Sequence, residues 1–279
     1  MTHPAPRRGA AGRRAAVLAV GLVLAGCGAG SGGAGGDGDG RQPSAGPTSV
    51  GPLSGALTVL AASSLSESFA ELGRRFEADH PGLTVSLNLA ASSSLSRQLV
   101  EGAPGDVLAT ADDVSMQRAV EAGAVGSPTA FARNRLEIVT RPGNPERIAG
   151  LADLSRPGLL VVRCAQEVPC GRLATEALAK AGVTVVAASS EENVKAALSR
   201  VSLGEADAGI VYVTDVLAAG DDVVAGVPIP DVHNVVATYP LAISTSAANP
   251  AAARAWVDFV LAPSGREVLS KFGFAPATP

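Results

Sequence analysis

Serine hydroxyls gather at two places in the sequence where an apolar strand pattern gives way to a helix pattern. The stretch LTVLAASSLSESF (residues 57–69) places Ser63 and Ser64 at the first of these turns, and the triplet SSS at 92–94 opens a second helix. A hydroxyl group donates a hydrogen bond, and a helix N-terminus adds free N–H groups and the positive end of the helix dipole. Neutral donors in this arrangement are suited to holding an anion.

Two further helix beginnings have a similar character. The stretch EVPCGRLATEAL opens a helix around Cys170 with little side-chain bulk, and SSEENVKAAL places Val194 in the first turn of another helix. All four helices follow strands, so their N-termini are expected to face one cleft. A purely structural alternative exists for Ser64, because Glu67 follows it at the spacing of a capping box, in which Ser64 only caps its own helix.

Tyr212 ends the apolar stretch GIVY, from which its phenol O–H group can point into the same cleft. The alternative is a half-buried core tyrosine. Hydroxyl and N–H donors suit a dianion in particular, because a fully deprotonated oxyanion only accepts hydrogen bonds and excludes a carboxylate from direct contact. With roughly five to seven charge-assisted bonds, no lysine or arginine is needed against the anion.

The elements that must position these residues alternate between strand and helix patterns from residue 56 onward. Apolar runs such as ALTVLAA, LTVSLNL and VLAT are separated by helix patterns, and the helix after the first run has Leu65, Phe69, Leu72 and Phe76 on one stripe. After RLEIVT the rhythm repeats with LLVVRCA, VTVVAAS, AGIVYV and VVAGVPI. This pattern predicts an α/β fold with two similar lobes, each a mainly parallel sheet flanked by helices.

Lobe boundaries follow from the same pattern. We expect residues 55–133 to form the first part of lobe 1, residues 134–238 to form lobe 2, and residues 239–279 to return to lobe 1 with two C-terminal helices. Two strands that cross between the lobes leave a ligand cleft, which can close by a hinge motion.

The N-terminal segment predicts export. Four arginines and no acid precede AAVLAVGLVL (15–24), which is apolar but far too short to span a bilayer. The next residues, LAGC, resemble the lipobox of bacterial lipoproteins, which implies a signal peptide at 1–26 and a lipidated Cys27 on the outer face of the cell membrane. An ordinary secretory signal is the alternative. Residues 27–54 are rich in Gly, Ser, Ala and Pro and are expected to form a disordered tether.

Charge and cysteine content narrow the partners further. Removal of the four signal arginines leaves 18 basic against 26 acidic residues, a net charge of −8, which makes nucleic acid and anionic lipid headgroups poor partners. Cys164 and Cys170 form an even pair in an exported chain, for which a disulfide is expected. Free thiols and a metal site are the alternatives, although two cysteines without a nearby histidine are an incomplete ligand set.

Six stretches in order resemble the molybdate-binding proteins of bacterial ABC importers, which have a type II periplasmic-binding-protein fold. The stretches are AASSLSESF, ASSSLSRQLVEGAPGDV, EVPCGRLATEAL, ENVKAAL, GIVYVTD and VLSKFGF, and the resemblance covers residues 55–274. It implies a tetrahedral oxyanion held by the hydroxyls of Ser64, Ser92 and Tyr212 and by the backbone amides of Cys170 and Val194. Cys170 departs from the alanine expected in many members. Its side chain is free to bond Cys164 if only its amide is used, whereas a sulfur turned inward would narrow the pocket.

The resemblance implies a monomeric, lipid-anchored receptor that captures molybdate, and also tungstate, for the permease of an ABC importer. Such a protein is no enzyme and needs no cofactor, and it binds molybdenum only as the oxyanion. Sulfate is expected to bind more weakly because it is smaller, and phosphate is disfavoured because it keeps protons that meet only donors.

Four other functions remain as alternatives. A receptor for sulfate or another small oxyanion is the nearest of these. A serine hydrolase finds no support in a G-x-S-x-G motif, and His3, His80 and His233 lie on no recognisable catalytic motif. A sugar receptor is disfavoured by an aromatic content of 3%, and a purely structural lipoprotein leaves the donor-rich helix starts unexplained.

Overall fold

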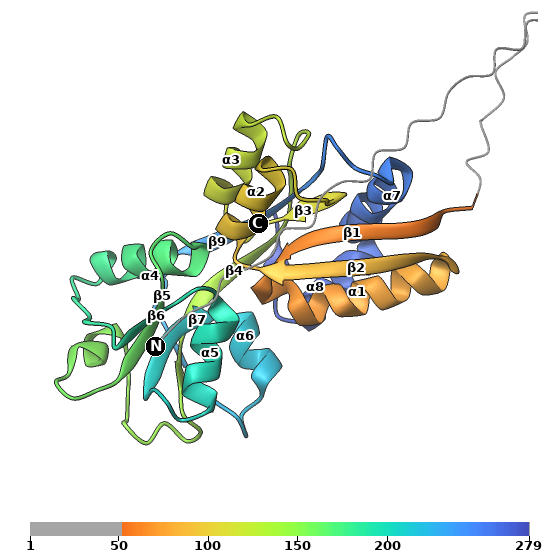
Figure 1. Cartoon of the computed structure of the whole chain (residues 1–279). Coiled ribbons are helices and arrows are strands. Elements are labelled where there is room, and N and C mark those ends of the chain that lie inside the picture. Colours follow the sequence, from red (N-terminus) through yellow and green to blue (C-terminus); the bar gives the residue numbers. More distant parts are fainter. Residues whose placement is uncertain (1–51, 279) are drawn as a thin grey trace, which may run out of the picture. The chain divides into compact units, whose positions relative to one another are not determined.

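The computed structural model describes residues 52–278, whose elements largely alternate between strand and helix (Figure 1). The strands are β1 (Ser54–Ala62), β2 (Gly82–Ala90), β3 (Val107–Ala109), β4 (Thr129–Thr140), β5 (Val161–Cys164), β6 (Ser189–Glu191), β7 (Ala208–Tyr212), β8 (Ala225–Pro228), β9 (Val236–Ile243) and β10 (Ala275–Pro276). The helices are α1 (Ser66–Asp79), α2 (Ser92–Val100), α3 (Asp113–Glu121), α4 (Pro169–Lys180), α5 (Val194–Ser202), α6 (Val213–Ala219), α7 (Pro250–Leu261) and α8 (Pro263–Lys271). Two short 3-10 helices are η1 (Ser63–Leu65) and η2 (Leu151–Ser155).

The expected signal peptide, Cys27 and nearly all of the expected tether lie outside the described residues. The tether was expected to continue to residue 54, but Ser54 already belongs to β1 and pairs with Gly82 of β2. No helix within residues 52–278 is both long enough and apolar enough to cross a bilayer.

The strands are hydrogen-bonded in the order β2-β1-β3-β9-β4-β7-β5-β6, and β8 and β10 also pair with β4. Parallel pairs form on both flanks, between β1 and β2, β1 and β3, β5 and β6, and β5 and β7. The central strands β9 and β4 run antiparallel to their neighbours. The predicted α/β class is confirmed, with parallel flanks joined through an antiparallel centre.

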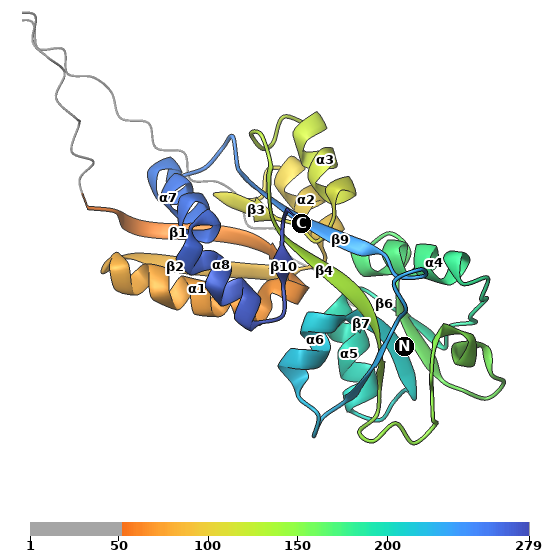
Figure 2. The same cartoon turned by 180° about the vertical axis from the view of Figure 1, so that it is seen from behind.

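Strand β4 belongs to two sheets. Its residues 129–135 pair with β9, and its residues 136–140 pair with β7. We call β2-β1-β3-β9-β4 the first sheet and β4-β7-β5-β6, with β8, the second sheet. Figure 2 shows β4 and β9 running together from one group of helices to the other. The sequence pattern had predicted only residues 135–140 of this strand, so the half of β4 that pairs with β9 was missed.

One predicted strand forms only at its end. The run VTVVAAS (183–189) was expected to be a strand, but the pairing with β5 begins at Ser189 and residues 183–187 adopt no regular structure. Val186 is 88% exposed, whereas Val185 beside it is buried. Because β5 has only four residues, it offers a partner to no more than the last part of the run, and β-propensity without a partner strand forms no sheet.

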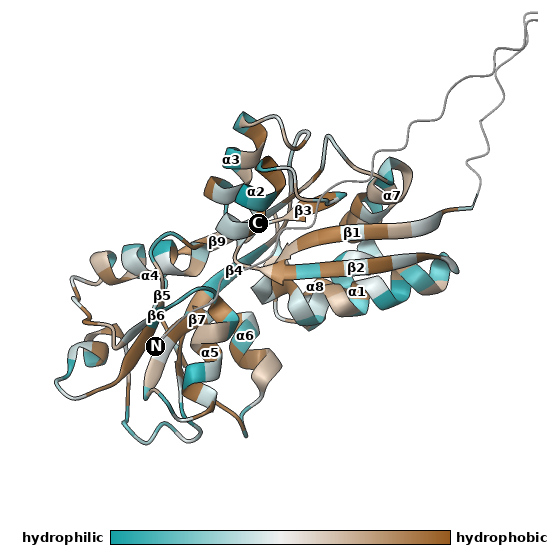
Figure 3. Cartoon of the chain, in the orientation of Figure 1, coloured by the Kyte–Doolittle hydropathy of each residue, from teal (hydrophilic) through white to brown (hydrophobic). Residues whose placement is uncertain are grey.

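Helices cover both faces of the first sheet. Val59 of β1 belongs to the same buried cluster as the apolar side chains of α1, α7 and α8, whereas the next residue, Leu60, packs with those of α2 and α3. This alternation is the period-2 pattern of a strand buried on both faces. Figure 3 shows largely apolar strands and helices such as α1 that carry both polar and apolar residues.

The C-terminal helices pack against the first sheet. Trp256 of α7 is fully buried, and its ring lies 5.8 Å from that of Phe69 and 5.3 Å from that of Phe76, both on α1. Edge-on aromatic contacts of this kind stabilise a core beyond simple burial. The apolar stripe predicted for α1 is confirmed, because Leu65, Phe69, Leu72 and Phe76 are all at most 1% exposed.

Candidate functional site

Four helix beginnings surround one small cavity. Its lining residues are Ala62, Ser63, Ser64, Ala90, Ala91, Ser92, Ala111, Val168, Pro169, Cys170, Asn193, Val194 and Tyr212. These residues come from both sheets and from the N-termini of η1, α2, α4 and α5. The structure therefore brings together Ser64, Ser92, Cys170, Val194 and Tyr212, the five residues that the sequence singled out. Within this described lining, no side chain carries a formal charge at neutral pH.

Ser64 lies in η1 directly after β1 and is 4% exposed. Its Oγ is 2.9 Å from the phenol oxygen of Tyr239 on β9. The capping-box alternative is wrong, because in the described chain no side chain caps η1 or α1 and Glu67 turns to Lys195 instead. The 3-10 turn shifts the start of α1 to Ser66, which leaves the Ser64 side chain at the cavity.

Ser92 is the first residue of α2 and is 1% exposed. Its Oγ accepts a hydrogen bond from the backbone amide of Ala111 at 2.9 Å. Because Oγ is the acceptor in this bond, the hydroxyl proton of Ser92 is not used in it and is free to turn toward the cavity.

The start of α4 is held close to the end of β5. Cys170 forms a disulfide with Cys164, the last residue of β5, and both cysteines are 3% exposed. The amides of Gly171 and Arg172 donate to the carbonyl of Val168 at 3.1 Å, whereas the amide of Cys170 lies in the first turn, where a helix offers no carbonyl of its own. The sulfur of Cys170 is bonded to Cys164, so its backbone N–H is the group left for a ligand.

The first turn of α4 has room only for a glycine at position 171. A Cβ atom at position 171 would lie 1.9 Å from the carbonyl oxygen of Ala165. Any side chain would therefore push the start of α4 away from the loop that follows β5.

The start of α5 is capped by a residue that the sequence reasoning missed. The side chain of Asn193 accepts a hydrogen bond from the amide of Ala196 at 3.0 Å, and Asn193 itself lines the cavity. This cap leaves the amides of Val194 and Lys195 in the first turn without an intrahelical acceptor. The signal was present in the sequence, because asparagine directly before an apolar helix pattern is a preferred N-cap.

Tyr212 ends β7 and is 1% exposed, so it is fully buried instead of half-buried, and it belongs to the core as well as to the cavity lining. Within the described chain its phenol oxygen is buried and has no hydrogen-bond partner, although Tyr212 lines the cavity. Burial, and to a lesser extent the neighbouring Tyr239, raises the pKa of Tyr212 well above its ordinary value. The phenol thus stays protonated at neutral pH and can donate a hydrogen bond to a ligand in the cavity.

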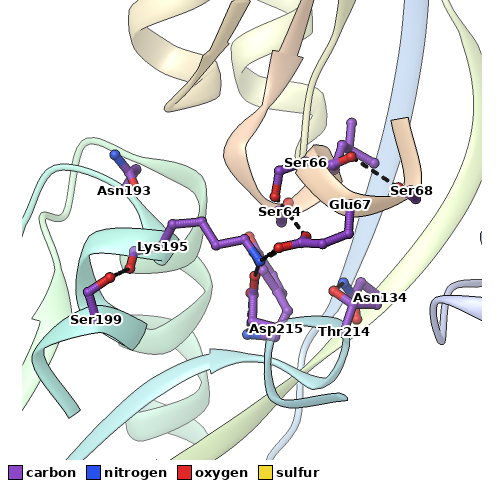
Figure 4. Close-up of polar contacts among 12 residues, drawn as sticks. Ser64, Ser66, Glu67, Ser68, Asn134, Asn193, Lys195, Ser199, Thr214 and Asp215 are labelled. Carbon is purple, nitrogen blue, oxygen red and sulfur yellow. Dashed lines mark hydrogen bonds and ion pairs between the residues drawn. The ribbon is translucent and has the colours of Figure 1, made fainter. Parts of the chain in front are cut away.

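Charged side chains lie near the cavity but outside its lining (Figure 4). Lys195 of α5 reaches Glu67 of α1 at 2.8 Å and Asp215 of α6 at 3.1 Å. On another side, Arg172 of α4 donates from Nε to Asp112, the N-cap of α3, at 3.0 Å. The contacts of Lys195 with Glu67 and of Arg172 with Asp112 join helix starts of the first sheet to helix starts of the second.

Burial and pairing act against each other in the cluster of Glu67, Lys195 and Asp215. Burial raises the pKa of Asp215, and the charge of Lys195 only partly offsets that rise. For Lys195 burial lowers the pKa, but the charge of Asp215 and the contacts with Glu67 outweigh it, so the pKa of Lys195 is raised. For Glu67 burial raises the pKa, but hydrogen bonds from Lys195 and Ser66 outweigh it, so the pKa of Glu67 is lowered.

The described residues contain no group of three or more His, Cys, Asp or Glu side chains placed to hold a metal ion. What the cavity offers is a lining with serine and tyrosine hydroxyls and with residues in the first turns of helices. Such an arrangement can bind a small anion through hydrogen bonds.

Comparisons with known proteins place the chain among transport proteins. The family model for bacterial extracellular solute-binding proteins matches residues 57–275. The molybdate-binding protein ModA of Mycobacterium tuberculosis (strain H37Rv) is 41% identical over 228 residues, which cover 81% of this chain and 87% of that protein.

Two solved structures are similar to this one at lower identity. The periplasmic molybdate-binding protein of Azotobacter vinelandii superposes with a TM-score of 0.68 at 21% identity, over 78% of this chain and 98% of that one. The sulfate-binding protein SubI of Mycobacterium tuberculosis H37Rv gives a TM-score of 0.69 at 22% identity, over 80% and 88% of the two chains. At these identities the structures show the fold alone, which is the type II periplasmic-binding-protein fold.

Proposed function

We propose that this chain, which belongs to the family of bacterial extracellular solute-binding proteins, captures molybdate for an ABC importer. The observation that carries the proposal is that five residues from four helix starts and one strand end meet at a single cavity with only neutral lining side chains. The relative that is 41% identical and is named for molybdate binding supports the same ligand.

The chemistry follows from the donors of the described site. Ser64, Ser92 and Tyr212 present hydroxyl protons, and Cys170 and Val194 present backbone amides in the first turns of α4 and α5. Molybdate carries two negative charges and four acceptor oxygens, so every one of these groups meets an acceptor. A charge-assisted hydrogen bond contributes about 1.5–3 kcal/mol net, and five of them support micromolar or tighter binding after the costs of ordering.

Neutral donors also give selectivity. A cage of fixed amides and hydroxyls fits one oxyanion radius and leaves donors unpaired around a smaller one. We therefore propose that tungstate, whose oxyanion is close to molybdate in size and charge, also binds. Sulfate is the alternative ligand because it has the same charge and shape, and because the fold is also similar to that of a sulfate-binding protein.

The remaining parts of the proposal concern the whole protein. We infer that residues 1–26 are a signal peptide and that a lipid on Cys27 anchors the chain to the outer face of the membrane. Residues 55–133 and 239–279 would form one lobe and residues 134–238 the other, with the cavity between them. The protein would act as a monomer that hands its anion to a membrane permease without chemical change and without a cofactor.

Calorimetric titration of the purified chain with molybdate, tungstate, sulfate and phosphate at neutral pH tests the proposal. The expected result is tight one-to-one binding of molybdate and tungstate, weak binding of sulfate and no heat from phosphate. Binding of sulfate alone would assign the chain to sulfate transport, and no binding of any of the four anions would refute an oxyanion receptor.

A further inference from the structure

Tyr239 is a second buried tyrosine beside the site, although it is not among the described lining residues of the cavity. It lies on β9, is 0% exposed, and its phenol oxygen is 2.9 Å from Oγ of Ser64. Either oxygen of this pair can be the donor, so the direction of the hydrogen bond depends on what else surrounds the phenol.

Asn134 of β4 settles that direction. Its Oδ1 accepts from the amide of Arg135 at 2.9 Å, and its Nδ2 donates to Oγ1 of Thr214 at 2.8 Å. The amide of Arg135 can only donate, so its bond identifies Oδ1 as the oxygen of the Asn134 side chain and leaves Nδ2 as the nitrogen. Figure 4 shows Asn134 beside Thr214. The same Nδ2 lies 3.4 Å from the phenol oxygen of Tyr239 and can only donate to it.

The proton of Tyr239 consequently has one acceptor among its described neighbours, which is Oγ of Ser64. Burial is the main cause that raises the pKa of Tyr239, so the phenol keeps this proton at neutral pH. Once Ser64 accepts from Tyr239, the hydroxyl proton of Ser64 is directed elsewhere, and the cavity is the space it faces.

We propose that Tyr239 is a positioning residue that makes Ser64 a donor toward the bound anion, with Asn134 fixing the direction of the chain of hydrogen bonds. The inference rests on the proposed function and adds the reason why the site discriminates between oxyanions. Oγ of Ser92 likewise accepts a hydrogen bond, here from the amide of Ala111, so both serines can donate their hydroxyl proton to the ligand. Each serine oxygen then already accepts one hydrogen bond from the protein, so it is a poorer acceptor for the proton of an oxyanion such as phosphate at pH 7.

A double-mutant cycle between Tyr239→Phe and Ser64→Ala tests this assignment. In the unmodified background, Tyr239→Phe is expected to weaken molybdate binding about 5- to 15-fold, which corresponds to one hydrogen bond. In the Ser64→Ala background the same replacement is expected to change molybdate affinity less than 2-fold, because Tyr239 acts through Ser64. Additive losses in the two backgrounds would overturn the inference.

The selectivity of the site between molybdate and phosphate is a second measurement, because a merely structural role of Tyr239 would leave that selectivity unchanged. Tyr239→Phe removes the hydrogen bond that Oγ of Ser64 accepts, so this oxygen becomes a better acceptor for a proton of phosphate. With the phosphate affinity taken from competition against bound molybdate, the ratio of molybdate to phosphate affinity at pH 7 is expected to fall by more than the molybdate affinity itself. Thr214→Val is the matched control, because it removes a hydrogen bond from the same buried cluster and leaves the Tyr239 hydroxyl in place. A change in the ratio with Thr214→Val equal to that with Tyr239→Phe would overturn the assignment.

Failure of this inference and failure of the proposed function give different results. If the unmodified chain binds neither molybdate nor tungstate, the proposed ligand is wrong. The cycle is therefore also measured without ligand, as shifts in the midpoint of thermal unfolding. Non-additive shifts support coupling between Tyr239 and Ser64, and additive shifts overturn the inference whatever the ligand.

Discussion

Lys195 of α5 contacts Glu67 of α1 through a charge pair of 2.8 Å (Figure 4), which joins the first turns of two helices that begin beside the candidate cavity. Glu67 follows Ser64 by three positions, and Lys195 directly follows Val194. The pair therefore forms only when the helix starts that line the cavity stand close together. A contact with this dependence favours the closed arrangement over one in which the two sheets move apart.

Replacement of Glu67 by Gln is expected to weaken molybdate binding about 2- to 5-fold, the usual size of a partly exposed ion pair. The side chain of Glu67 is 42% exposed, so the loss should shrink as salt is added. Asp215 still neutralises Lys195 in this variant, so the fold should be preserved. Calorimetry at low and high ionic strength measures the effect, and Glu176→Gln, which breaks a pair with Lys180 within α4, is the control. Equal affinities for Glu67→Gln and the unmodified chain at low salt would show that the pair does not favour closure.

The Glu67 pair also predicts a dependence of stability on pH. The pKa of Glu67 is lowered in the folded chain, so its contribution is present above its ordinary value of 4.5 and is lost as the pH falls through the folded value. Asp215 acts in the opposite sense, because its pKa is raised. The measurement is therefore the difference in unfolding midpoint between the chain and Glu67→Gln from pH 7 to pH 3. That difference should shrink as the pH falls, and a constant difference would contradict the assigned shift.

Tyr212→Phe is expected to have opposite effects on binding and on stability. The phenol of Tyr212 is buried without a partner in the described chain, so its removal should leave the ligand-free stability unchanged or raise it. The same change removes a donor to the anion and should weaken molybdate binding by about 1–3 kcal/mol. Thermal unfolding without ligand and calorimetry with ligand measure the two effects.

Tyr239→Phe provides the contrast for Tyr212→Phe, since the Tyr239 phenol is bonded to Ser64 and its removal should lower both stability and affinity. If Tyr212→Phe also lowers the ligand-free unfolding midpoint, the hydroxyl of Tyr212 has a hydrogen-bond partner in the protein and is not an unpaired donor to the anion.

Local sequence patterns located the helix starts that meet at the cavity, and the family resemblance selected five residues from them and from a strand end, whereas Asn193 was missed. Ser64, Ser92, Cys170 and Val194 each follow an apolar strand run at the start of a helix, and strand ends of one sheet edge converge. Tyr212 was found in the same way, at the end of an apolar run. The position of each of these residues at a helix start or strand end depends on a few neighbouring residues along the chain.

The partners of these residues were not predictable in the same way. Tyr239 meets Ser64 across 175 positions, and Lys195 meets Glu67 across 128. Nothing in the local pattern around Tyr239 distinguishes it from any other tyrosine in an apolar strand. The first contact depends on the registers of β9 against β3 and of β3 against β1, and the second depends on the approach of α5 to α1. A single sequence reveals neither of them.

Ser92→Ala is expected to weaken molybdate binding by about 1–3 kcal/mol and to lower stability as well. The second effect arises because the amide of Ala111 loses its buried acceptor. Both affinity and the unfolding midpoint are measured, with Ser202→Ala as the control, since Ser202 bonds only the backbone of its own helix α5. Unchanged affinity in Ser92→Ala would remove this serine from the anion site.

Reduction of the disulfide between Cys164 and Cys170 is expected to weaken both the fold and the site. The bond closes a short loop, for which loss of the cross-link costs about 2 kcal/mol of stability. It also ties the first turn of α4, and with it the amide of Cys170, to the end of β5. Calorimetry and thermal unfolding with and without dithiothreitol should show lower molybdate affinity and a lower midpoint in the reduced chain.

The double variant Cys164→Ser/Cys170→Ser separates reduction from other effects of the reagent. It should bind molybdate as weakly as the reduced chain and should not respond to dithiothreitol, because its backbone amide at position 170 remains but is no longer held by a cross-link. If this variant binds as tightly as the oxidised chain, the position of the amide is fixed by the close contact between Gly171 and Ala165, and the disulfide contributes to stability alone.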